Sequence, residues 1–320
     1  MAEIVIGAAL SHSPVMNFEP PADAKAQVEA YRRAAHHIGE EIRAAQPDVL
    51  VVIAQDHFRT SFYNNMPAFL IGVGDVTRWG DWRGTTGPLK TDVELARHIS
   101  RGLFERSFEP AVSYDMKVDH GTAQVLELFD MTDMPVIPIQ VNAAAPPQPT
   151  PARCYAFGEA LRGAVQAFVG ERRVAVIGSG GLSHAPLKVS IDTEQNPQNR
   201  DFFIHGRVAP GGPTEVERIK AIMSRLEQLA EAINPEWDRM LLSRIEAGRA
   251  RELATELNTD SIEVAGGRGG QEFRSWLAML GAAQAQEVRT VFYEPVRYLV
   301  TGMGAIVARG TQARSVAEQA

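Results

Sequence analysis

Short apolar segments rich in β-branched residues alternate with longer amphipathic segments over the first half of the chain. The apolar segments predict β-strands at residues 4–10, 49–55, 68–73, 111–115, 136–141 and 174–177. The amphipathic segments predict helices at about residues 23–45, 92–106, 123–129 and 151–168. Strands that are apolar along their whole length are typical of a sheet covered on both faces. The pattern therefore predicts an α/β fold with a largely parallel central sheet and helices on both of its faces.

The pattern changes after His184. Residues 188–213 are polar and rich in Asn, Gln, Gly and Pro, which predicts a long loop of the kind that often binds a ligand. Further helices are predicted at about residues 214–232, 236–247 and 271–285. Two later apolar segments are expected to return to the sheet, at residues 291–293 and 298–300. We find neither a repeat nor a linker, so we predict one domain over residues 1–320 with a helical C-terminal elaboration, mainly at 214–285.

Composition and charge exclude several classes of protein. Hydrophobic residues make up 45% of the chain and charged residues 22%, as in ordinary globular proteins. The net charge of −7, with no run of like charges, argues against nucleic-acid binding. The start of the chain lacks the basic region of a signal peptide, and no apolar run approaches the ~20 residues of a membrane span. The single cysteine, Cys154, excludes an intrachain disulfide and a thiolate metal site. We expect a soluble cytoplasmic protein without a membrane partner.

Four of the eight histidines follow the ends of predicted strands: His12, His57, His120 and His184. The carboxyl ends of parallel strands meet at one edge of an open sheet, where ligands bind. Imidazole is both a common metal ligand and the side chain that moves protons near neutral pH. We therefore infer one metal site with histidine acid–base groups beside it. The alternative is that each imidazole is separately satisfied by backbone groups.

Two of these histidines directly follow an aspartate. Asp56 precedes His57 and is expected either to hold the second nitrogen of that ring, as carboxylates commonly do for ligating histidines, or to cap the next segment. Asp119 precedes His120 at a turn into a predicted helix, where either residue could instead serve as the helix cap.

A glycine-rich segment, GSGGLS at residues 178–183, leads into His184. Glycines allow the backbone to approach a ligand closely. A phosphate-binding loop is the competing interpretation, but the segment lacks the lysine of a P-loop and the spacing of a dinucleotide fingerprint. We favour the catalytic histidine.

A metal held by two histidines needs a further ligand, and because the chain has no usable cysteine this ligand must be a carboxylate, another histidine or water. Two histidines and one carboxylate are typical of non-haem Fe(II) oxygenases. The same ligand set serves catalytic zinc, so this pattern leaves both metals open. Glu272 follows the GGRGG segment at residues 266–270, at the start of a predicted helix. A favourable interaction with the helix dipole is the alternative explanation for a carboxylate there.

Several segments together resemble the class III extradiol ring-cleaving dioxygenases, the superfamily of the protocatechuate 4,5-dioxygenase catalytic subunit. The segments are SHSP (11–14), DHF (56–58), FYNNMPAFLIGVG (62–74), AVSYDMKVDHG (111–121), GSGGLSH (178–184), INPEWD (233–238) and GGQEFRSW (269–276). They span nearly the whole chain. The resemblance implies a single catalytic domain that uses Fe(II) and O2 to cleave the ring of a catechol-type substrate in aromatic-compound degradation.

The resemblance also implies roles for individual residues. The Fe(II) ligands would be His12, His57 and Glu272. His120 and His184 would form the acid–base pair that faces the substrate, with the division of roles between them left open. Asp119 and Pro186 match positions that flank this pair.

Substrates of the family are catechols that carry a carboxylate or an aliphatic or aryl side chain, so we expect a catecholic aromatic acid. Candidates to bind a substrate carboxylate are Arg59, Arg78, Arg83 and Arg268. Candidates to line an aromatic pocket are Trp79, Trp82, Phe58 and Phe62. Alternatives are a zinc hydrolase on the same fold, a non-catalytic binding member of the superfamily and a nucleotide-binding module. We expect a homo-oligomer, and the sequence leaves open whether a small accessory subunit is needed.

Overall fold

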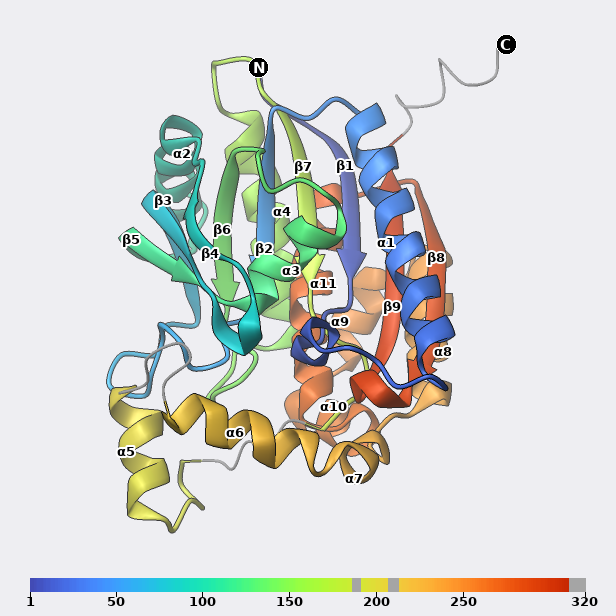
Figure 1. The fold of residues 1–320 in the computed structure, drawn as a ribbon. Coiled ribbons are helices and arrows are strands. Elements are labelled where there is room, and N and C mark those ends of the chain that lie inside the picture. The colour runs from blue at the N-terminus through green and yellow to red at the C-terminus, as the bar shows by residue number, and fades with distance from the viewer. Residues whose placement is uncertain (186–190, 207–212, 311–320) are drawn as a thin grey trace.

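The computed structural model describes residues 1–185, 191–206 and 213–310. Within these residues nine strands form one sheet in the order β4-β3-β6-β2-β7-β1-β9-β8, with β5 paired to β3 (Figure 1). The strands are β1 (Glu3–Leu10), β2 (Val49–Ala54), β3 (Phe69–Trp79), β4 (Thr86–Leu89), β5 (Ala111–Val118), β6 (Val136–Val141), β7 (Arg173–Ser179), β8 (Glu287–Val296) and β9 (Thr301–Arg309). Every strand predicted before residue 180 is present, and β4 is an additional strand.

The sheet is mixed, so the α/β class is confirmed but the prediction of a largely parallel sheet is wrong. The central strands β6, β2, β7 and β1 are parallel, and β5 is parallel to β3. The pairs β3–β4, β3–β6, β1–β9 and β8–β9 are antiparallel. The segment 298–300, predicted as a strand, lies in the short turn between β8 and β9. So short a connection can join only antiparallel strands, because a parallel pair needs a long crossover.

Helices cover both faces of the sheet, as predicted (Figure 1). They are α1 (Lys25–Ala44), α2 (Val93–Phe104), α3 (His120–Leu128), α4 (Pro151–Gln166), α5 (Pro197–His205), α6 (Pro213–Met223), α7 (Leu226–Ala230), α8 (Pro235–Glu246), α9 (Ala250–Glu256), α10 (Thr259–Gly266) and α11 (Phe273–Ala283). Short 3-10 helices are η1 (Pro14–Asn17), η2 (Asp81–Arg83), η3 (Gly269–Glu272) and η4 (Arg297–Leu299).

Strand β2 shows why its sequence is apolar without interruption. Val51 and Ile53 belong to the core cluster that also contains apolar residues of α2, α4 and α11. Leu50 and Val52 belong to a second cluster, which contains residues of α1 and α3. Successive side chains of a strand point to opposite faces, so both sets are buried. The strand is therefore fixed between two helical layers.

The chain between β7 and α8 differs from the predicted polar loop at 188–213. Residues 186–190 and 207–212 lie outside the described residues, and Pro186 is among them. Residues Pro197–His205 form helix α5, whose cap residue Asn196 accepts hydrogen bonds from the backbone N–H groups of Gln198 and Asn199. Asn followed by Pro is a good helix start, so the polar composition here marks a helix terminus as well as a loop.

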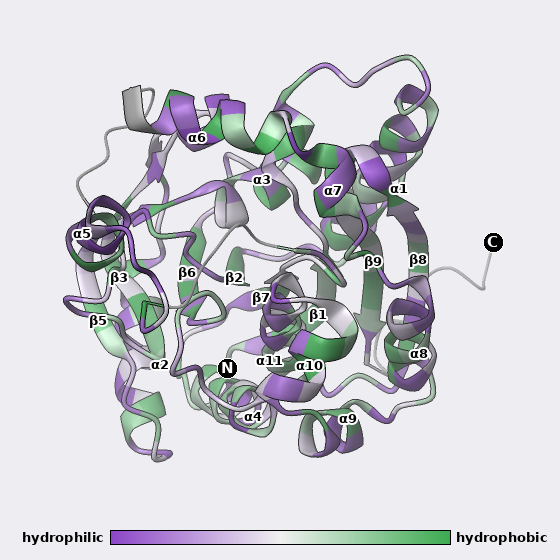
Figure 2. Cartoon of the chain, turned by 90° about the horizontal axis from the view of Figure 1, so that it is seen from below, coloured by the Kyte–Doolittle hydropathy of each residue, from purple (hydrophilic) through white to green (hydrophobic). Residues whose placement is uncertain are grey.

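Helices α5, α6 and α7 lie below the sheet in Figure 1, on the side to which the central parallel strands point. Seen from below in Figure 2, these helices and α10 surround the ends of β2, β7 and β1. The helical elaboration predicted after residue 213 is present, with α9 and α10 as additional helices before α11. Among the described residues, no helix has the length and apolar character needed to cross a membrane.

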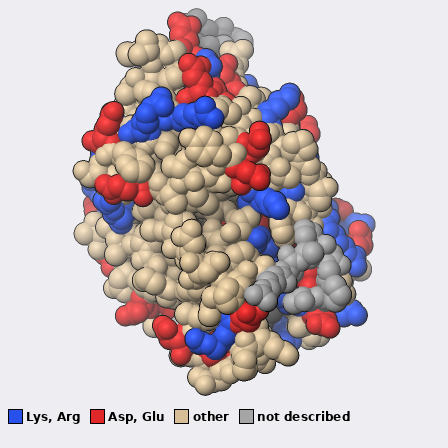
Figure 3. All heavy atoms as spheres, turned by 90° about the vertical axis from the view of Figure 1, so that its left-hand side faces the viewer, with Lys and Arg blue, Asp and Glu red and all other residues tan. Residues whose placement is uncertain are grey.

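The face with edge strand β5 is shown in Figure 3, where basic and acidic side chains are interspersed around a broad uncharged area. Strand β5 exposes Tyr114 and Val112. Its exposed Asp115 and Lys117 alternate with buried Met116 and Val118. Charged side chains on an edge strand oppose edge-to-edge pairing with another chain.

Candidate metal centre and active site

The four strand-end histidines converge on one cavity. His12 follows β1, His57 follows β2, His120 begins α3 after β5, and His184 ends the loop after β7. All four line a cavity of about 730 Å³. The His57 and His120 rings stack with centroids 4.2 Å apart, and the His12 ring lies 5.3 Å from His57 and 5.4 Å from His120.

Glu272 reaches the same point from η3, far along the chain. Its Oε1 lies 3.2 Å from Nε2 of His57 and 3.5 Å from Nε2 of His184. Its Oε2 lies 3.7 Å from Nε2 of His12 and accepts the backbone N–H of Gly181 at 2.8 Å. The structure thus brings all three predicted metal ligands together. The glycine-rich loop uses this N–H to hold a protein carboxylate, which argues against the phosphate-binding interpretation.

The hydrogen bonds around His12 define which of its nitrogens carries the lone pair. Ser179 Oγ donates its one hydrogen to the carbonyl oxygen of Gly121 at 2.5 Å, so it accepts from Nδ1–H of His12 at 2.9 Å. Nε2 therefore carries the lone pair, and it lies 3.1 Å from the Gln55 amide nitrogen. Burial lowers the pKa of His12 to about 3, although Glu272 opposes the shift. A neutral imidazole with a free lone pair is the form that ligates a metal.

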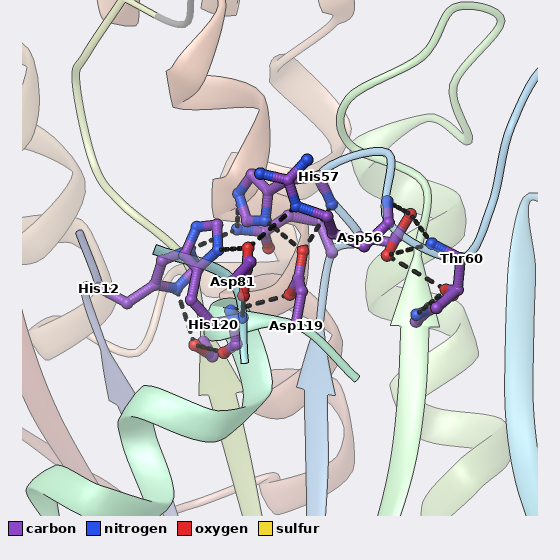
Figure 4. A network of polar contacts seen from close by, with 12 residues as sticks. His12, Asp56, His57, Thr60, Asp81, Asp119 and His120 are labelled. Atoms are coloured by element: carbon purple, nitrogen blue, oxygen red, sulfur yellow. Dashed lines mark hydrogen bonds and ion pairs between the residues drawn. The ribbon is translucent and has the colours of Figure 1, made fainter. Parts of the chain in front are cut away.

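Asp119, and not Asp56, holds His57. Asp119 Oδ2 accepts from the backbone N–H of His57 at 2.7 Å and from its Nδ1 at 2.8 Å (Figure 4). Asp119 Oδ1 also accepts from Gly121 N as the cap of α3. Of the two alternatives for Asp56, the structure shows the cap of the next segment: its carboxylate accepts the backbone N–H groups of Arg59, Thr60 and Ser61.

The two carboxylates beside His57 control its charge. Burial alone would lower the pKa of His57, but Asp119 and Glu272 raise it to about 9. Burial would raise the pKa of Asp119, and the neighbouring His57 and His120 instead hold it below its usual range. The two carboxylates therefore favour a positive charge at His57, which a bound cation would supply in place of the proton.

His120 is oriented by Asp81, a residue that sequence reasoning missed. Asp81 Oδ1 accepts from the backbone N–H of His120 at 3.0 Å, and Oδ2 accepts from its Nδ1 at 2.6 Å (Figure 4). Strand β3 was predicted to end at residue 73 but continues to Trp79. With the correct end, Asp81 would have been recognised as another polar residue at a strand terminus. Gln55, at the end of the strand predicted at 49–55, carried the same signal and was also missed.

His184 is held by its own loop. Its Nδ1 donates to the carbonyl oxygen of Leu182 at 2.9 Å, which leaves the lone pair on Nε2. Asp238 fixes the loop by accepting from Ser183 N at 2.8 Å and Ser183 Oγ at 2.7 Å. A side chain at Gly269 would come within 2.2 Å of the His184 ring, so only glycine fits beside it. Burial would lower the pKa of His184, but Glu272 raises it.

Three overlapping sets of residues offer ligand atoms for a cation at this point. His12, His57 and His120 each offer a nitrogen, and these atoms lie within 4.8 Å of one another. The predicted set has Glu272 in place of His120. The third set consists of Asp81, Asp119 and His120. The carboxylate of Glu272 adds negative charge close to both His12 and His57, which a divalent ion would balance.

Some of the arginine and aromatic residues predicted to contact the substrate line the cavity, and others lie elsewhere. Of the four arginines, Arg59 and Arg268 line the cavity. Arg78 donates to Thr85, and Arg83 lies over the ring of Phe18. Of the aromatic candidates, Trp82 lines the cavity, Trp79 lies beneath Lys117, and Phe58 and Phe62 pack with Phe203. The remaining histidines, which do not line it, are His36, His37, His98 and His205.

Comparisons with known proteins agree with the family resemblance of the motifs. A family model described as "Catalytic LigB subunit of aromatic ring-opening dioxygenase" matches residues 7–308. The chain is 33% identical over 309 residues to a 2,3-dihydroxyphenylpropionate/2,3-dihydroxicinnamic acid 1,2-dioxygenase of Photorhabdus laumondii, covering 93% of this chain and 95% of that protein. It is also 33% identical over 315 residues to the protein of the same name from Escherichia coli K12, covering 94% and 97%.

Among solved structures, the chain is similar to an uncharacterized protein from Escherichia coli K12, JW3007. The TM-score is 0.53 with 14% sequence identity, and the match covers 95% of this chain and 99% of that chain. At this identity the likeness shows the fold alone. It supports the arrangement of sheet and helices on which the four histidines converge.

Proposed function

This chain belongs to the family of catalytic LigB subunits of aromatic ring-opening dioxygenases and is a ring-cleavage dioxygenase, and from that premise we propose that it is Fe(II)-dependent and extradiol. It would cleave a substituted catechol beside its two hydroxyl groups and incorporate both atoms of O2. The observation that carries the proposal is the meeting of His12, His57 and Glu272, with His120 and His184 in the same cavity wall.

The donor set supports iron. Two imidazole nitrogens and one carboxylate leave vacant positions on an Fe(II) ion and are typical of non-haem oxygenases. His12, His57 and Glu272 would hold Fe(II), and the chemistry that this ion would supply is electron transfer between the catechol and O2. Asp119 fixes the His57 ring through its Nδ1, so it is a positioning residue for this ligand.

His184 is the proposed base. Its Nδ1–H is used by the Leu182 carbonyl group, so the lone pair on Nε2 is available to take a proton from a catechol hydroxyl group. Glu272 raises the pKa of His184 against the effect of burial, which strengthens the base near neutral pH.

His120 is the proposed acid. It would supply the proton that one oxygen atom needs when the O–O bond breaks. Asp81 accepts from its Nδ1 at 2.6 Å and so fixes the orientation of the ring. The stack of His57 and His120 at 4.2 Å keeps this proton donor beside the ligand set.

The substrate proposal is a catecholic aromatic acid, with cleavage at the 1,2 bond. The names of the two relatives contain 2,3-dihydroxyphenylpropionate and 2,3-dihydroxicinnamic acid, which are both of this type. Trp82, Phe202 and Val300 give the cavity an apolar wall suited to an aromatic ring. We further propose that residues 1–320 act as one catalytic domain in the cytoplasm, where a single unpaired cysteine is ordinary.

The test is oxygen uptake on a panel of catechols by protein purified without oxygen and supplied with ferrous iron. We expect one O2 consumed for each catechol and a yellow ring-opened product. Metal analysis of the same sample separates the zinc alternative. Stoichiometric zinc, no response to ferrous iron and no oxygen uptake on any catechol would contradict the proposal.

A further inference from the structure

Three arginine side chains that the proposed chemistry does not use line the same cavity as the histidines. Arg268 pairs with Glu263, whereas Arg59 and Arg218 each keep one nitrogen without a partner in the described part of the chain. Arg59 belongs to the loop after β2, and Arg218 belongs to helix α6. The Nη1 atom of each is buried and has no hydrogen-bond partner among the described residues. Buried polar groups without partners are uncommon, because leaving them unpaired costs free energy. Two such groups at one cavity indicate a binding site for an acceptor.

Arg59 is rigidly held except at this one nitrogen. Its side chain is only 3% exposed, and its Nε donates to Asp81 Oδ2 at 3.1 Å. Its Nη2 lies 3.8 Å from Glu215 Oε1. Asp81 Oδ2 is the same atom that accepts from His120. Asp81 therefore links Arg59 to His120, the proposed acid. Nη1 of Arg59 has no hydrogen-bond partner among the described residues.

Arg218 approaches from the helical wall. Its guanidinium carbon lies 4.3 Å from the centre of the Phe202 ring, which also lines the cavity. Burial lowers the pKa of Arg218 to about 10, and repulsion from Arg59 contributes, against the opposing effects of Glu215 and Asp81. Both guanidinium groups belong to the wall of one cavity, so an anion bound there would be attracted to both.

The other charged groups of this wall are acidic. Glu194 accepts from the backbone N–H of Asn196 and from the Asn199 amide, and Asp201 accepts from His205. Glu217 is an exposed residue of α6 beside Arg218. Glu215 accepts the backbone N–H of Trp82. None of these contacts uses the two Nη1 groups, which remain the unsatisfied donors of the wall among the described residues.

We propose that Arg59 and Arg218 bind the side-chain carboxylate of the substrate through their guanidinium groups and so select catechols that carry an acidic side chain. The proposal rests on the proposed function for the position of the catechol ring at the histidines. Guanidinium groups suit a carboxylate because their donors are planar and always charged. The apolar wall of Trp82 and Phe202 would contact the part of the substrate between its two polar ends.

The first experiment is calorimetric binding, which needs neither metal nor turnover. The full chain is titrated with 3-phenylpropionate and with its neutral amide, 3-phenylpropionamide. We expect the acid to bind more tightly, and Arg218→Gln to weaken only the acid by about tenfold or more. Arg218→Lys should bind the acid with an affinity between those of the wild type and Arg218→Gln. Arg225→Gln removes an exposed arginine of the next segment that pairs with Gln228 and should leave binding unchanged.

Equal binding of acid and amide by the wild-type chain would overturn this inference, and so would acid binding that survives in a folded Arg218→Gln. A thermal melt of each variant checks folding. Turnover of a catechol with a propionate side chain and of neutral 3-propylcatechol then separates the two proposals. If neither is cleaved, the proposed function fails while calorimetry still decides the carboxylate site. If both are cleaved and Arg218→Gln slows both equally, the carboxylate site fails and the function stands.

Discussion

The floor of the cavity carries the four histidines and Glu272, and its helical wall carries Phe202 of α5 and Arg218 of α6. The two regions differ in how their polar groups are paired. On the floor every histidine has a protein partner: Ser179 for His12, Asp119 for His57, Asp81 for His120 and the Leu182 carbonyl group for His184. On the wall, Arg218 keeps a buried nitrogen without a partner among the described residues.

This difference in pairing indicates that the floor binds the metal and moves protons, whereas the wall recognises the substrate. Groups that bind a metal or move a proton gain from fixed orientation and a fixed tautomer, so their free nitrogens are all directed into one space. A group that recognises the substrate gains from an unsatisfied donor that only the right ligand can pair. Changes on the floor should therefore abolish or slow the reaction, whereas changes on the wall should alter which substrate is used.

The largest effect is expected for Glu272→Gln. The amide keeps the shape of the side chain but removes the negative charge close to His12 and His57. We expect loss of bound iron and of detectable oxygen uptake, measured by metal analysis of the protein loaded without oxygen. Glu263→Gln is the control, since it removes a partly exposed carboxylate that pairs with Arg268. Full iron occupancy in Glu272→Gln would remove this residue from the ligand set and favour His120 as the third ligand.

The next largest effect is expected for His184→Ala. Loss of a positioned base costs about 10²–10⁴ in rate, and we expect this loss in kcat with iron content retained. His120→Ala should behave similarly if its role is that of the acid. His205→Ala, an exposed histidine on α5, is the matched control. Wild-type turnover in His184→Ala would exclude His184 as the base. Loss of iron from His184→Ala would indicate that His184 is a metal ligand.

A smaller effect is expected for Asp119→Asn. The amide oxygen can still accept from His57, but it carries no charge to support the ring, so iron affinity should fall about 10–100-fold. Asp56→Asn provides the contrast, because Asp56 closes a loop and does not contact an imidazole nitrogen in the described residues. It should lower the melting temperature and leave iron affinity near that of the wild type. The reverse result would restore Asp56 as the residue that supports His57.

The pH dependence of metal binding tests the electrostatics of the floor. In the metal-free protein Asp119 and Glu272 raise the pKa of His57 to about 9, against burial, so below that pH the ring holds a proton that the metal must displace. Apparent affinity should therefore rise by about tenfold per pH unit up to about pH 9 and then level off. A Co²⁺ titration between pH 6.5 and 9.5 measures this slope. An affinity independent of pH would show that no proton leaves when the metal binds.

The smallest effect is expected on the wall, for Phe202→Leu. This change removes the ring beneath the Arg218 guanidinium, a contact worth about 0.5–1 kcal/mol at exposed sites. We expect KM for an acidic catechol to rise about two- to fivefold with kcat unchanged. Neutral 3-propylcatechol provides the internal control. A fall in kcat for both substrates would place Phe202 with the floor rather than with the wall.

The sequence alone was sufficient to place the central strands β1, β2, β6 and β7 and to predict the convergence of the histidines. An apolar run such as residues 49–54 has to be buried on both faces, so its position and its end can be predicted from composition. Once the strands are placed, the chain residues that follow them share one edge of the sheet. His12, His57 and His184 could therefore be assigned to one site before any coordinates were known.

Only the tertiary structure decided how the polar groups pair. Asp56 precedes His57 in sequence, but Asp119 contacts its ring, because a side chain pairs with what the fold brings near it and not with its neighbour in the chain. Asp81 beside His120 and Arg218 beside the cavity were not predicted, since each lies on an element whose path depends on long-range packing. The antiparallel direction of β9 also depends on the tertiary structure. A short turn after β8 reverses the chain, and β9 then pairs with β1. Local pattern determines which segments are buried, whereas the partners of polar groups depend on distances between remote parts of the chain.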